Sequence, residues 1–141
     1  MKAILFAILI LISVNSFPQQ QMHRFEILRV IDGDTIVFRA PFLPAPLKQE
    51  LYLRVYGVDT PEKGRRAKCD QESSKSTLAT EFTKNQIAKA KDKQIILTDW
   101  DKYGGRVLGD IILDGKSLRA SLIKSGHARE YFGERKTSWC N

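Results

Sequence analysis

The stretch Leu51-Tyr52-Leu53-Arg54-Val55-Tyr56-Gly57-Val58 is the most informative segment for the fold. Its residues alternate: Leu51, Leu53, Val55 and Gly57 fall on one side, and Tyr52, Arg54, Tyr56 and Val58 on the other. Alternation with a period of two is typical of a strand that buries one face. Thr60-Pro61-Glu62 then follows, and the fixed φ of proline predicts a rigid turn at the end of the strand.

Two strands are predicted before this segment. Residues Arg24 to Ile31 are rich in β-forming side chains, and so is the run Thr35 to Phe38. Asp32-Gly33 lies between them, and Asp-Gly between two such runs indicates a β-hairpin. Pro41, Pro44 and Pro46 make the next stretch a loop, because proline cannot donate to a sheet ladder.

Beyond this segment the pattern changes to helix and then returns to strand. From about Ser73 to Lys91 the apolar residues recur at helical spacing, and they are Leu78, Phe82, Ile87 and Ala88. Further strands are predicted at Gln94 to Leu97 and Arg106 to Leu113, and a short helix at Leu118 to Lys124 between an N-cap Ser117 and Gly126. The order predicts an α+β, mainly β fold: a five-stranded OB-fold barrel with a helix between strands three and four and a short second helix.

The N-terminus carries the pattern of an export signal. Met1-Lys2 precedes an unbroken apolar run from Ala3 to Ile12, which is shorter than the roughly 20 residues of a membrane span. We expect cleavage near Ser16, so that residues 1–16 are a signal peptide, 17–23 a polar, flexible leader, and 24–141 the domain with a short C-terminal tail. An uncleaved N-terminal anchor is the alternative. Export predicts a secreted or periplasmic protein, free of the membrane after cleavage.

The chain is basic, with 23 Lys and Arg against 16 Asp and Glu in 141 residues. Removing the signal leaves about 125 residues, enough for one domain around one core. A basic surface suits a polyanionic partner such as nucleic acid, because Lys and Arg displace the counterions condensed around phosphates. Charge alone does not decide this, since many exported proteins are simply basic.

Cys69 and Cys140 are the two cysteines of the chain. They are too few for a structural zinc site, which takes four Cys or His ligands. In an oxidising compartment they can form one bridge, which would close a long loop and tie the C-terminal tail to the start of the helical segment. Two unrelated thiols remain the alternative.

Several polar residues could carry chemistry, although each also has an ordinary explanation. Asp34 follows Asp32-Gly33 and could belong to nothing more than a hairpin turn. Asp59 and Glu62 flank Thr60-Pro61 and could be solvated turn residues. Arg54 could lie on a solvent-facing side of its strand, and Arg106, after Asp101-Lys102-Tyr103-Gly104-Gly105, could be a surface arginine. Their appearance together, in this order, is more informative.

From about Arg24 to Tyr131 the sequence resembles the staphylococcal nuclease (thermonuclease) family. The motifs that carry the resemblance are Val30-Ile31-Asp32-Gly33-Asp34-Thr35, Leu53-Arg54-Val55-Tyr56-Gly57-Val58-Asp59-Thr60-Pro61-Glu62 and Asp101-Lys102-Tyr103-Gly104-Gly105-Arg106. The resemblance implies an OB barrel and calcium-dependent hydrolysis of DNA and RNA that leaves 3′-phosphate ends. We also expect little sequence specificity and a monomer.

The resemblance also implies roles for single residues. Asp34 and Asp59 match the calcium-binding carboxylates, and Thr60 matches the residue whose carbonyl binds the same ion. Glu62 matches the proposed general base, Arg54 and Arg106 the phosphate-binding arginines, and Lys102 and Tyr103 side chains near the nucleotide phosphate. Ca²⁺ prefers such oxygen ligands, and arginines give bidentate hydrogen bonds to phosphate.

The sequence departs from the family pattern in two places. The type member has one glycine between the tyrosine and the second arginine, whereas Gly104 and Gly105 stand here. Its long terminal helix is also absent, and a tail ending in Trp139-Cys140 takes that place, which the predicted disulfide would pin. Because related domains in scaffold proteins bind nucleic acid without cleaving it, a non-catalytic OB-fold binding module is the alternative function.

Overall fold

The computed structural model describes residues 20–141. The predicted signal peptide, residues 1–16, lies outside the described residues, as does the leader before residue 20. The elements, in chain order, are β1 (Met22–His23), β2 (Ile27–Asp32), β3 (Thr35–Arg39), β4 (Glu50–Val55), β5 (Val58–Asp59), the 3-10 turn η1 (Gly64–Arg66), α1 (Asp70–Lys89), β6 (Lys93–Trp100), β7 (Arg106–Leu113), β8 (Lys116–Ser117), α2 (Leu118–Lys124) and β9 (Arg129–Glu130). Within this part of the chain, no helix is long and apolar enough to cross a membrane.

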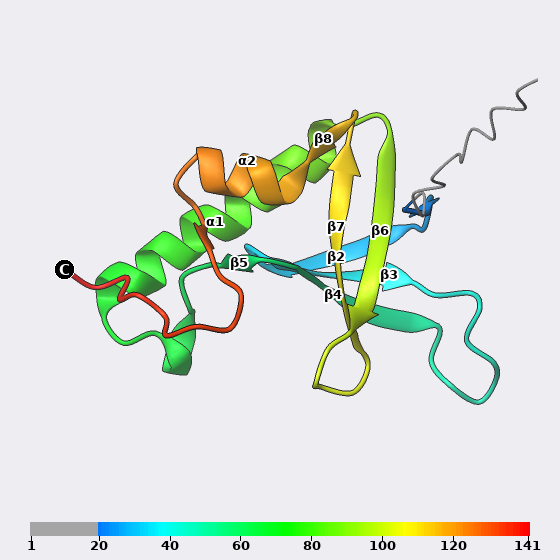
Figure 1. The fold of residues 1–141 in the computed structure, drawn as a ribbon, viewed down its shortest axis with the longest axis horizontal. Coiled ribbons are helices and arrows are strands. Elements are labelled where there is room, and N and C mark those ends of the chain that lie inside the picture. Colours follow the sequence, from blue (N-terminus) through cyan, green and yellow to red (C-terminus); the bar gives the residue numbers. More distant parts are fainter. Residues whose placement is uncertain (1–19) are drawn as a thin grey trace, which may run out of the picture.

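One mixed sheet dominates the molecule (Figure 1). Its strands run in the order β1-β6-β7-β4-β3-β2, and β8 pairs with β7 outside this path. β7 lies in the middle, antiparallel to β6 and parallel to β4. The strands and two helices confirm the predicted mainly-β α+β fold, with the long helix between the third and fourth long strands. Barrel closure is not confirmed, because β2 has no ladder with β6 or β1 among the described residues, so the sheet stays open.

The Asp-Gly signal marks a real hairpin: β2 and β3 are antiparallel, and Gly33-Asp34 connects them. Gly33 lies directly under α1, where an added Cβ would stand 2.9 Å from the Cβ of Ala79 and 3.1 Å from a methyl carbon of Thr60. The hydroxyl of Thr83 on α1 donates a 2.6 Å hydrogen bond to the Gly33 carbonyl. A glycine is therefore required for the helix to approach the hairpin turn this closely.

The third predicted strand is interrupted. β4 ends at Val55, and the chain turns at Tyr56-Gly57, where Gly57 has φ of 77°, before β5 begins at Val58. Within β4 the expected alternation holds, with Leu51, Leu53 and Val55 buried. The turn reverses the expected orientation of Val58, which is buried rather than on the side of Arg54.

The helices match the sequence to different degrees. α2 runs over the predicted residues, and the hydroxyl of its N-cap Ser117 accepts from the amide of Ala120. α1 begins at Asp70, three residues before the predicted Ser73. Its predicted apolar face is right in part: Ile87 is buried and Phe82 packs against the core, but Leu78 is 60% exposed and Ala88 is also exposed. Ile87 shares the buried face with Glu72, Ser76, Ala79 and Thr83.

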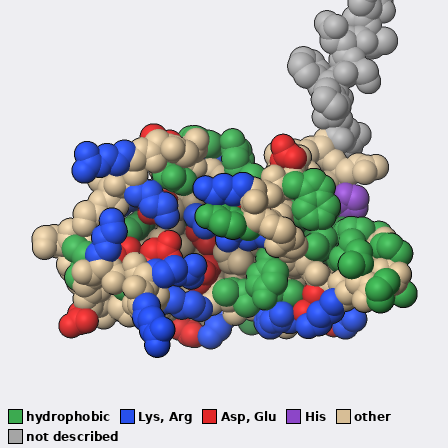
Figure 2. Space-filling view, turned by 90° about the horizontal axis from the view of Figure 1, so that it is seen from below, with side chains coloured by type: hydrophobic (Ala, Val, Ile, Leu, Met, Phe, Trp, Pro, Cys, Tyr) green, Lys and Arg blue, Asp and Glu red, His purple; other side chains and the backbone are tan. Residues whose placement is uncertain are grey.

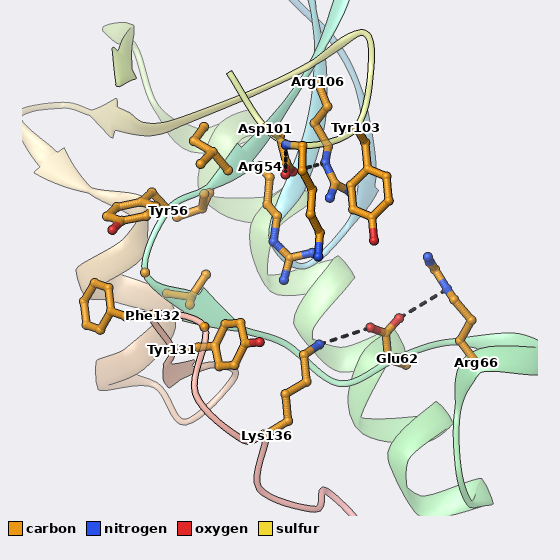
Figure 3. A pocket seen from close by; sticks show the side chains of 16 residues that line it. Arg54, Tyr56, Glu62, Arg66, Asp101, Tyr103, Arg106, Tyr131, Phe132 and Lys136 are labelled. Atoms are coloured by element: carbon orange, nitrogen blue, oxygen red, sulfur yellow. Dashed lines mark hydrogen bonds and ion pairs between the residues drawn. The ribbon is translucent and has the colours of Figure 1, made fainter. Parts of the chain in front are cut away.

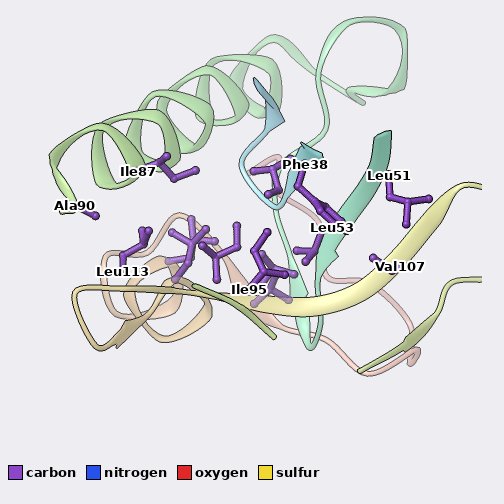
Figure 4. Close-up of a cluster of buried hydrophobic side chains, with 14 of the residues drawn as sticks. Phe38, Leu51, Leu53, Ile87, Ala90, Ile95, Val107 and Leu113 are labelled. Atoms are coloured by element: carbon purple, nitrogen blue, oxygen red, sulfur yellow. The ribbon is translucent and has the colours of Figure 1, made fainter. Parts of the chain in front are cut away.

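The core lies between the sheet and the C-terminal end of α1 (Figure 4). Phe38, Leu53 and Ile95 are fully buried at its centre, and Ile87 from the helix packs against them. At the sheet edge, β1 pairs with β6, so the part of the predicted leader at Met22–His23 has a defined partner. This arrangement leaves the ends of β3, β4 and β7 free to carry polar side chains.

Candidate functional site

A cavity of about 700 Å³ opens beside the ends of β4 and β7. Figure 2 shows Lys and Arg side chains around a hollow in which acidic side chains are visible. Arg54, Glu62 and Arg106 line the cavity, together with Lys102 and Tyr103 (Figure 3). The sheet explains part of this arrangement: in the parallel pair of β4 and β7, Tyr52 lies opposite Arg106 and Arg54 opposite Leu108. Neighbouring positions of paired strands share a face, so both arginines point to the same side.

Asp34 lies beneath the cavity in the β2–β3 turn and is only 3% exposed. Its Oδ1 accepts a 2.8 Å hydrogen bond from the hydroxyl of Thr35, and its Oδ2 lies 3.3 Å from Nη2 of Arg54. Burial raises the pKa of Asp34 to about 6; Arg54 opposes this shift, and the nearby charge of Asp32 adds to it. Burying a carboxylate with one cationic partner is costly, so this group favours additional positive charge nearby.

Asp59 is the second buried carboxylate, 4% exposed, on the short strand β5. Its Oδ2 accepts a 2.9 Å hydrogen bond from the indole N–H of Trp139. Its Oδ1 receives no well-directed hydrogen bond but lies 2.6 Å from the ammonium of Lys136. Burial alone would lower the pKa of Lys136, but the close contact with the negative charge of Asp59, with the charge of Glu62, raises it overall.

Glu62 stands at the mouth of the cavity between two cations (Figure 3). One carboxylate oxygen lies 3.2 Å from Nε of Arg66 and the other 3.5 Å from the ammonium of Lys136. Its backbone N–H donates 3.2 Å to the buried carboxylate of Glu72, which also accepts 2.7 Å from the amide of Lys68. Glu72, in the first turn of α1, thereby holds the loop that positions Glu62.

Arg106 reaches the cavity despite the extra glycine. Gly105 has φ of 74° and takes up the additional residue in the turn before β7, so that Arg106 is the first residue of the strand. Its Nε is paired with Asp101 at 2.5 Å, and its guanidinium lies 4.7 Å from the ring centre of Tyr103. The ammonium of Lys102 lies 5.3 Å from the same ring. These contacts orient a cationic wall opposite Glu62.

The structure brings most of the candidate residues to one place. Five of them line the cavity itself, namely Arg54, Glu62, Lys102, Tyr103 and Arg106. Asp34, Asp59 and Thr60 are buried and do not line it. Asp34 is connected to it through the ion pair with Arg54, and Asp59 through the ion pair with Lys136. Asp34 and Asp59 share no hydrogen-bond or ion-pair partner with each other in the described part of the chain.

The sequence did not point to several residues of this site, among them Arg66, Glu72, Lys136 and Trp139. Glu72 lies three residues after the N-cap Cys69, a position whose side chain often reaches back to free backbone amides. Lys136 and Trp139 lie in a segment without periodicity, and only the predicted disulfide hinted that they return to the domain. Cys69 and Cys140 are indeed joined by a disulfide.

The buried carboxylates have the chemistry of a hard-cation site. They offer oxygen donors, one of which, Oδ1 of Asp59, lacks a well-directed hydrogen bond, and a nearby cation would offset the burial that raises the pKa of Asp34. Among residues 20–141 there is no cluster of three or more His, Cys, Asp or Glu side chains placed around one point. A site of two carboxylates, a backbone carbonyl and waters would not count as such a cluster, and the oxygen donors present, with Oδ1 of Asp59 lacking a well-directed hydrogen bond, are of the kind that a divalent ion takes.

Fold and site together define a small, basic α+β domain with a cavity lined by arginine and lysine side chains beside buried acidic groups. The family model described as "Staphylococcal nuclease homologue" matches residues 52–139, and the chain belongs to this family. It is 35% identical over 113 residues to "Thermonuclease" of Staphylococcus hyicus, a match that covers 77% of this chain. It is 31% identical over 111 residues to "Endonuclease YhcR" of Bacillus subtilis (strain 168), which covers 74% of this chain. The chain spans 59% of the first relative and 8% of the second.

Proposed function

We propose that this protein is an exported, Ca²⁺-dependent nuclease that hydrolyses phosphodiester bonds of DNA and RNA and leaves 3′-phosphate ends. The observation that carries the proposal is the cavity itself, where Arg54 and Arg106 face Glu62 above two buried carboxylates. The names of the two relatives, a thermonuclease and an endonuclease, support the same class of reaction.

In this proposal Asp34, Asp59 and the carbonyl of Thr60 would hold the calcium ion. The bound ion would supply positive charge that offsets the negative charge gathering on a phosphoryl group during attack. Asp34 and Asp59 favour a bound cation, because both are buried and each has a single cationic neighbour, Arg54 or Lys136.

Arg54 and Arg106 would bind the phosphate to be cleaved. Each is fixed by one carboxylate, Asp34 or Asp101, and keeps further N–H groups for the ligand. Two guanidinium groups on one face of adjacent strands can donate several hydrogen bonds to the phosphoryl oxygens, and those bonds strengthen as charge builds up. Lys102 and Tyr103 would contact the neighbouring phosphate and sugar.

Glu62 would orient the attacking water and accept its proton. Its carboxylate lies at the cavity wall, while Arg66 and Lys136 limit its side-chain freedom and Glu72 fixes its backbone. Positioning of this kind, together with proton transfer to a carboxylate, contributes typically 10²–10⁴-fold to a rate.

The remaining expectations follow from the same features. A cavity that contacts phosphate through arginines does not contact base edges, so we propose little sequence specificity and activity on both DNA and RNA.

The Cys69–Cys140 disulfide supports an oxidising, secreted or periplasmic location after cleavage of the N-terminal signal. We propose that the enzyme acts as a monomer.

The decisive experiment offers supercoiled plasmid, single-stranded DNA and RNA to the purified protein with Ca²⁺ or with EDTA. We expect cleavage only with Ca²⁺, and product 3′ ends that terminal transferase extends only after phosphatase treatment. Glu62→Gln should lose 10²-fold or more of the rate. Glu81→Gln, which changes an exposed glutamate on α1, is the matched control and should keep it.

Two outcomes would contradict the proposal. Full activity of Glu62→Gln would remove the assigned general base. Salt-sensitive binding of DNA with no Ca²⁺-dependent cleavage would instead identify a nucleic-acid-binding module.

A further inference from the structure

The segment from Glu134 to Asn141, which we call the C-terminal strap, returns to the first turns of α1. Figure 1 shows the C-terminus beside that end of the helix. The disulfide from Cys140 to Cys69 holds the strap, and Nζ of Lys75 donates 2.9 Å to the carbonyl of Trp139. The amide of Asn141 donates 3.2 Å to the side chain of Gln71. The strap is therefore fastened to α1 at Trp139 and at the two residues that follow it.

Trp139 points from the strap into the domain and is 7% exposed. One face of its ring lies 3.8 Å from the guanidinium carbon of Arg129, and the same arginine donates 2.8 Å to the carbonyl of Ser138. Arg129 is the residue paired with Asp59 across the β5–β9 ladder. Arg129, Trp139 and Asp59 thus form a closed set of contacts in which each fixes the next.

The indole has one polar atom, a donor, and it is directed at Oδ2 of Asp59. This bond fixes the rotation of the carboxylate. The other oxygen of Asp59, Oδ1, then faces the ammonium of Lys136, so this oxygen already has a cation beside it. Hydrogen bonds that orient a metal-binding carboxylate commonly account for 10–100-fold in metal affinity.

We propose that Trp139 is a positioning residue that presents Asp59 to the divalent cation, and that the Cys69–Cys140 disulfide is required to keep Trp139 there. The inference rests on the proposed function, in which Asp59 binds Ca²⁺. It adds a strap residue, 80 positions away from Asp59 in the chain, to a site otherwise built from the strands and their turns.

Calcium binding to the EDTA-treated protein, measured by isothermal titration calorimetry, tests the indole bond. Trp139→Phe keeps a ring against Arg129 but removes the N–H, so the Kd for Ca²⁺ should rise about tenfold or more. Trp100→Phe is the matched control, because Trp100 is 61% exposed on β6, and its Kd should equal that of the wild type. Equal Kd values for Trp139→Phe and wild type would overturn the proposal.

Fluorescence of the Trp100→Phe protein gives a readout that does not require the Trp139→Phe protein to fold. In the Trp100→Phe protein, Trp139 is the single tryptophan, and its emission should change on addition of Ca²⁺ with the calorimetric Kd. In the Trp139→Phe protein, the emission of Trp100 should not respond. An unresponsive Trp139 in a protein that binds Ca²⁺ would contradict the contact with Asp59.

Reduction tests the disulfide. Treating Trp100→Phe with a phosphine reductant should shift the emission of Trp139 to longer wavelength and raise the Kd for Ca²⁺. The same treatment of a Cys69→Ala/Cys140→Ala protein that also carries Trp100→Phe should change neither value. If reduction leaves both values of the Trp100→Phe protein unchanged, the disulfide does not hold Trp139 in place and that half of the proposal fails.

The two proposals fail differently. If the wild type binds Ca²⁺ and cleaves DNA while Trp139→Phe does the same with unchanged constants, the nuclease stands and the positioning role falls. If the wild type neither binds Ca²⁺ nor cleaves, both fall.

Discussion

The two buried carboxylates of the site are held in different ways. Asp34 is fixed by its neighbours in the chain, Asp32 and Thr35, and by Arg54 on the adjoining strand. Asp59 is fixed by Lys136 and Trp139, which lie some 80 residues further along. One half of the site is thus built by a hairpin and the other by a strap that a disulfide returns to the domain. Residues with the same proposed role can therefore depend on different parts of the fold.

Removing the disulfide should give the largest difference in stability between the Asp34 region and the Asp59 region. The bridge spans 71 residues, so Cys69→Ala/Cys140→Ala should lower the free energy of unfolding by about 4 kcal/mol through loop-closure entropy. In native-state hydrogen exchange, amides of β5, β9 and the strap should lose more protection than those of the β2–β3 hairpin. Equal loss in both regions would show that the halves are not independent.

The pH dependence of stability should report on Asp34. A folded-state pKa of about 6, raised from the ordinary 3.8, means that the folded chain binds the proton more tightly than the unfolded chain. Stability from this group is therefore fully present below pH ~4 and is lost as the pH rises through ~6, a decrease of about 3 kcal/mol.

Urea unfolding of metal-free protein at pH 4 and pH 7 measures this decrease. Asp34→Asn should lack it, and Ca²⁺ at pH 7 should restore stability to the wild type. An identical pH dependence in the wild type and Asp34→Asn would contradict the raised pKa.

Crowding the hairpin turn should damage the Asp34 half. Gly33→Ala places a Cβ 2.9 Å from Ala79 and 3.1 Å from Thr60, so it should cost about 1–3 kcal/mol of stability. Gly104→Ala, at a loop position where an added Cβ meets nothing within 4 Å, is the matched control and should cost little. Thermal unfolding measures both, and equal melting temperatures would show that α1 can move away from the turn.

Removing the ammonium beside Asp59 should have the smallest effect. Lys136 pairs with Asp59 and Glu62, so it competes with a divalent cation for the same carboxylates. Lys136→Met should tighten Ca²⁺ binding roughly threefold to tenfold, since a partly exposed ion pair contributes little. Lys124→Met, at an exposed position at the end of α2, should leave the Kd unchanged. A weaker Ca²⁺ affinity in Lys136→Met would mean that Lys136 supports the site rather than competing for it.

The elements that depend on short stretches of sequence could be predicted. The Asp-Gly hairpin, β7 and α2 all follow from signals within a few residues, which are turn chemistry, alternation and caps. Asp34, Arg54, Glu62 and Arg106 were candidates because they belong to short motifs beside these elements, and the structure brings all of them to the cavity or directly beneath it.

The rest depends on contacts that no short segment contains. The apolar face of α1 was predicted only in part: Ile87 and Phe82 reach the core, but Leu78 does not, because the helix packs against a glycine turn where small and polar residues fit better. The break at Gly57 depends on φ of 77°, which alternation alone does not reveal. Trp139 and Lys136 reach Asp59 only through the return of the chain after β9, so their roles had no local signal.

The position of Trp139 in the chain also sets an order of events during biosynthesis. A ribosome moves from the N-terminus, so the hairpin with Asp34 and the strand with Arg106 emerge well before the indole that orients Asp59. The proposed calcium site would therefore mature last, once the strap has emerged and its thiols have been oxidised. Until the strap is in place, a newly made chain would have an incomplete calcium site while it is still close to the nucleic acids of its own cell.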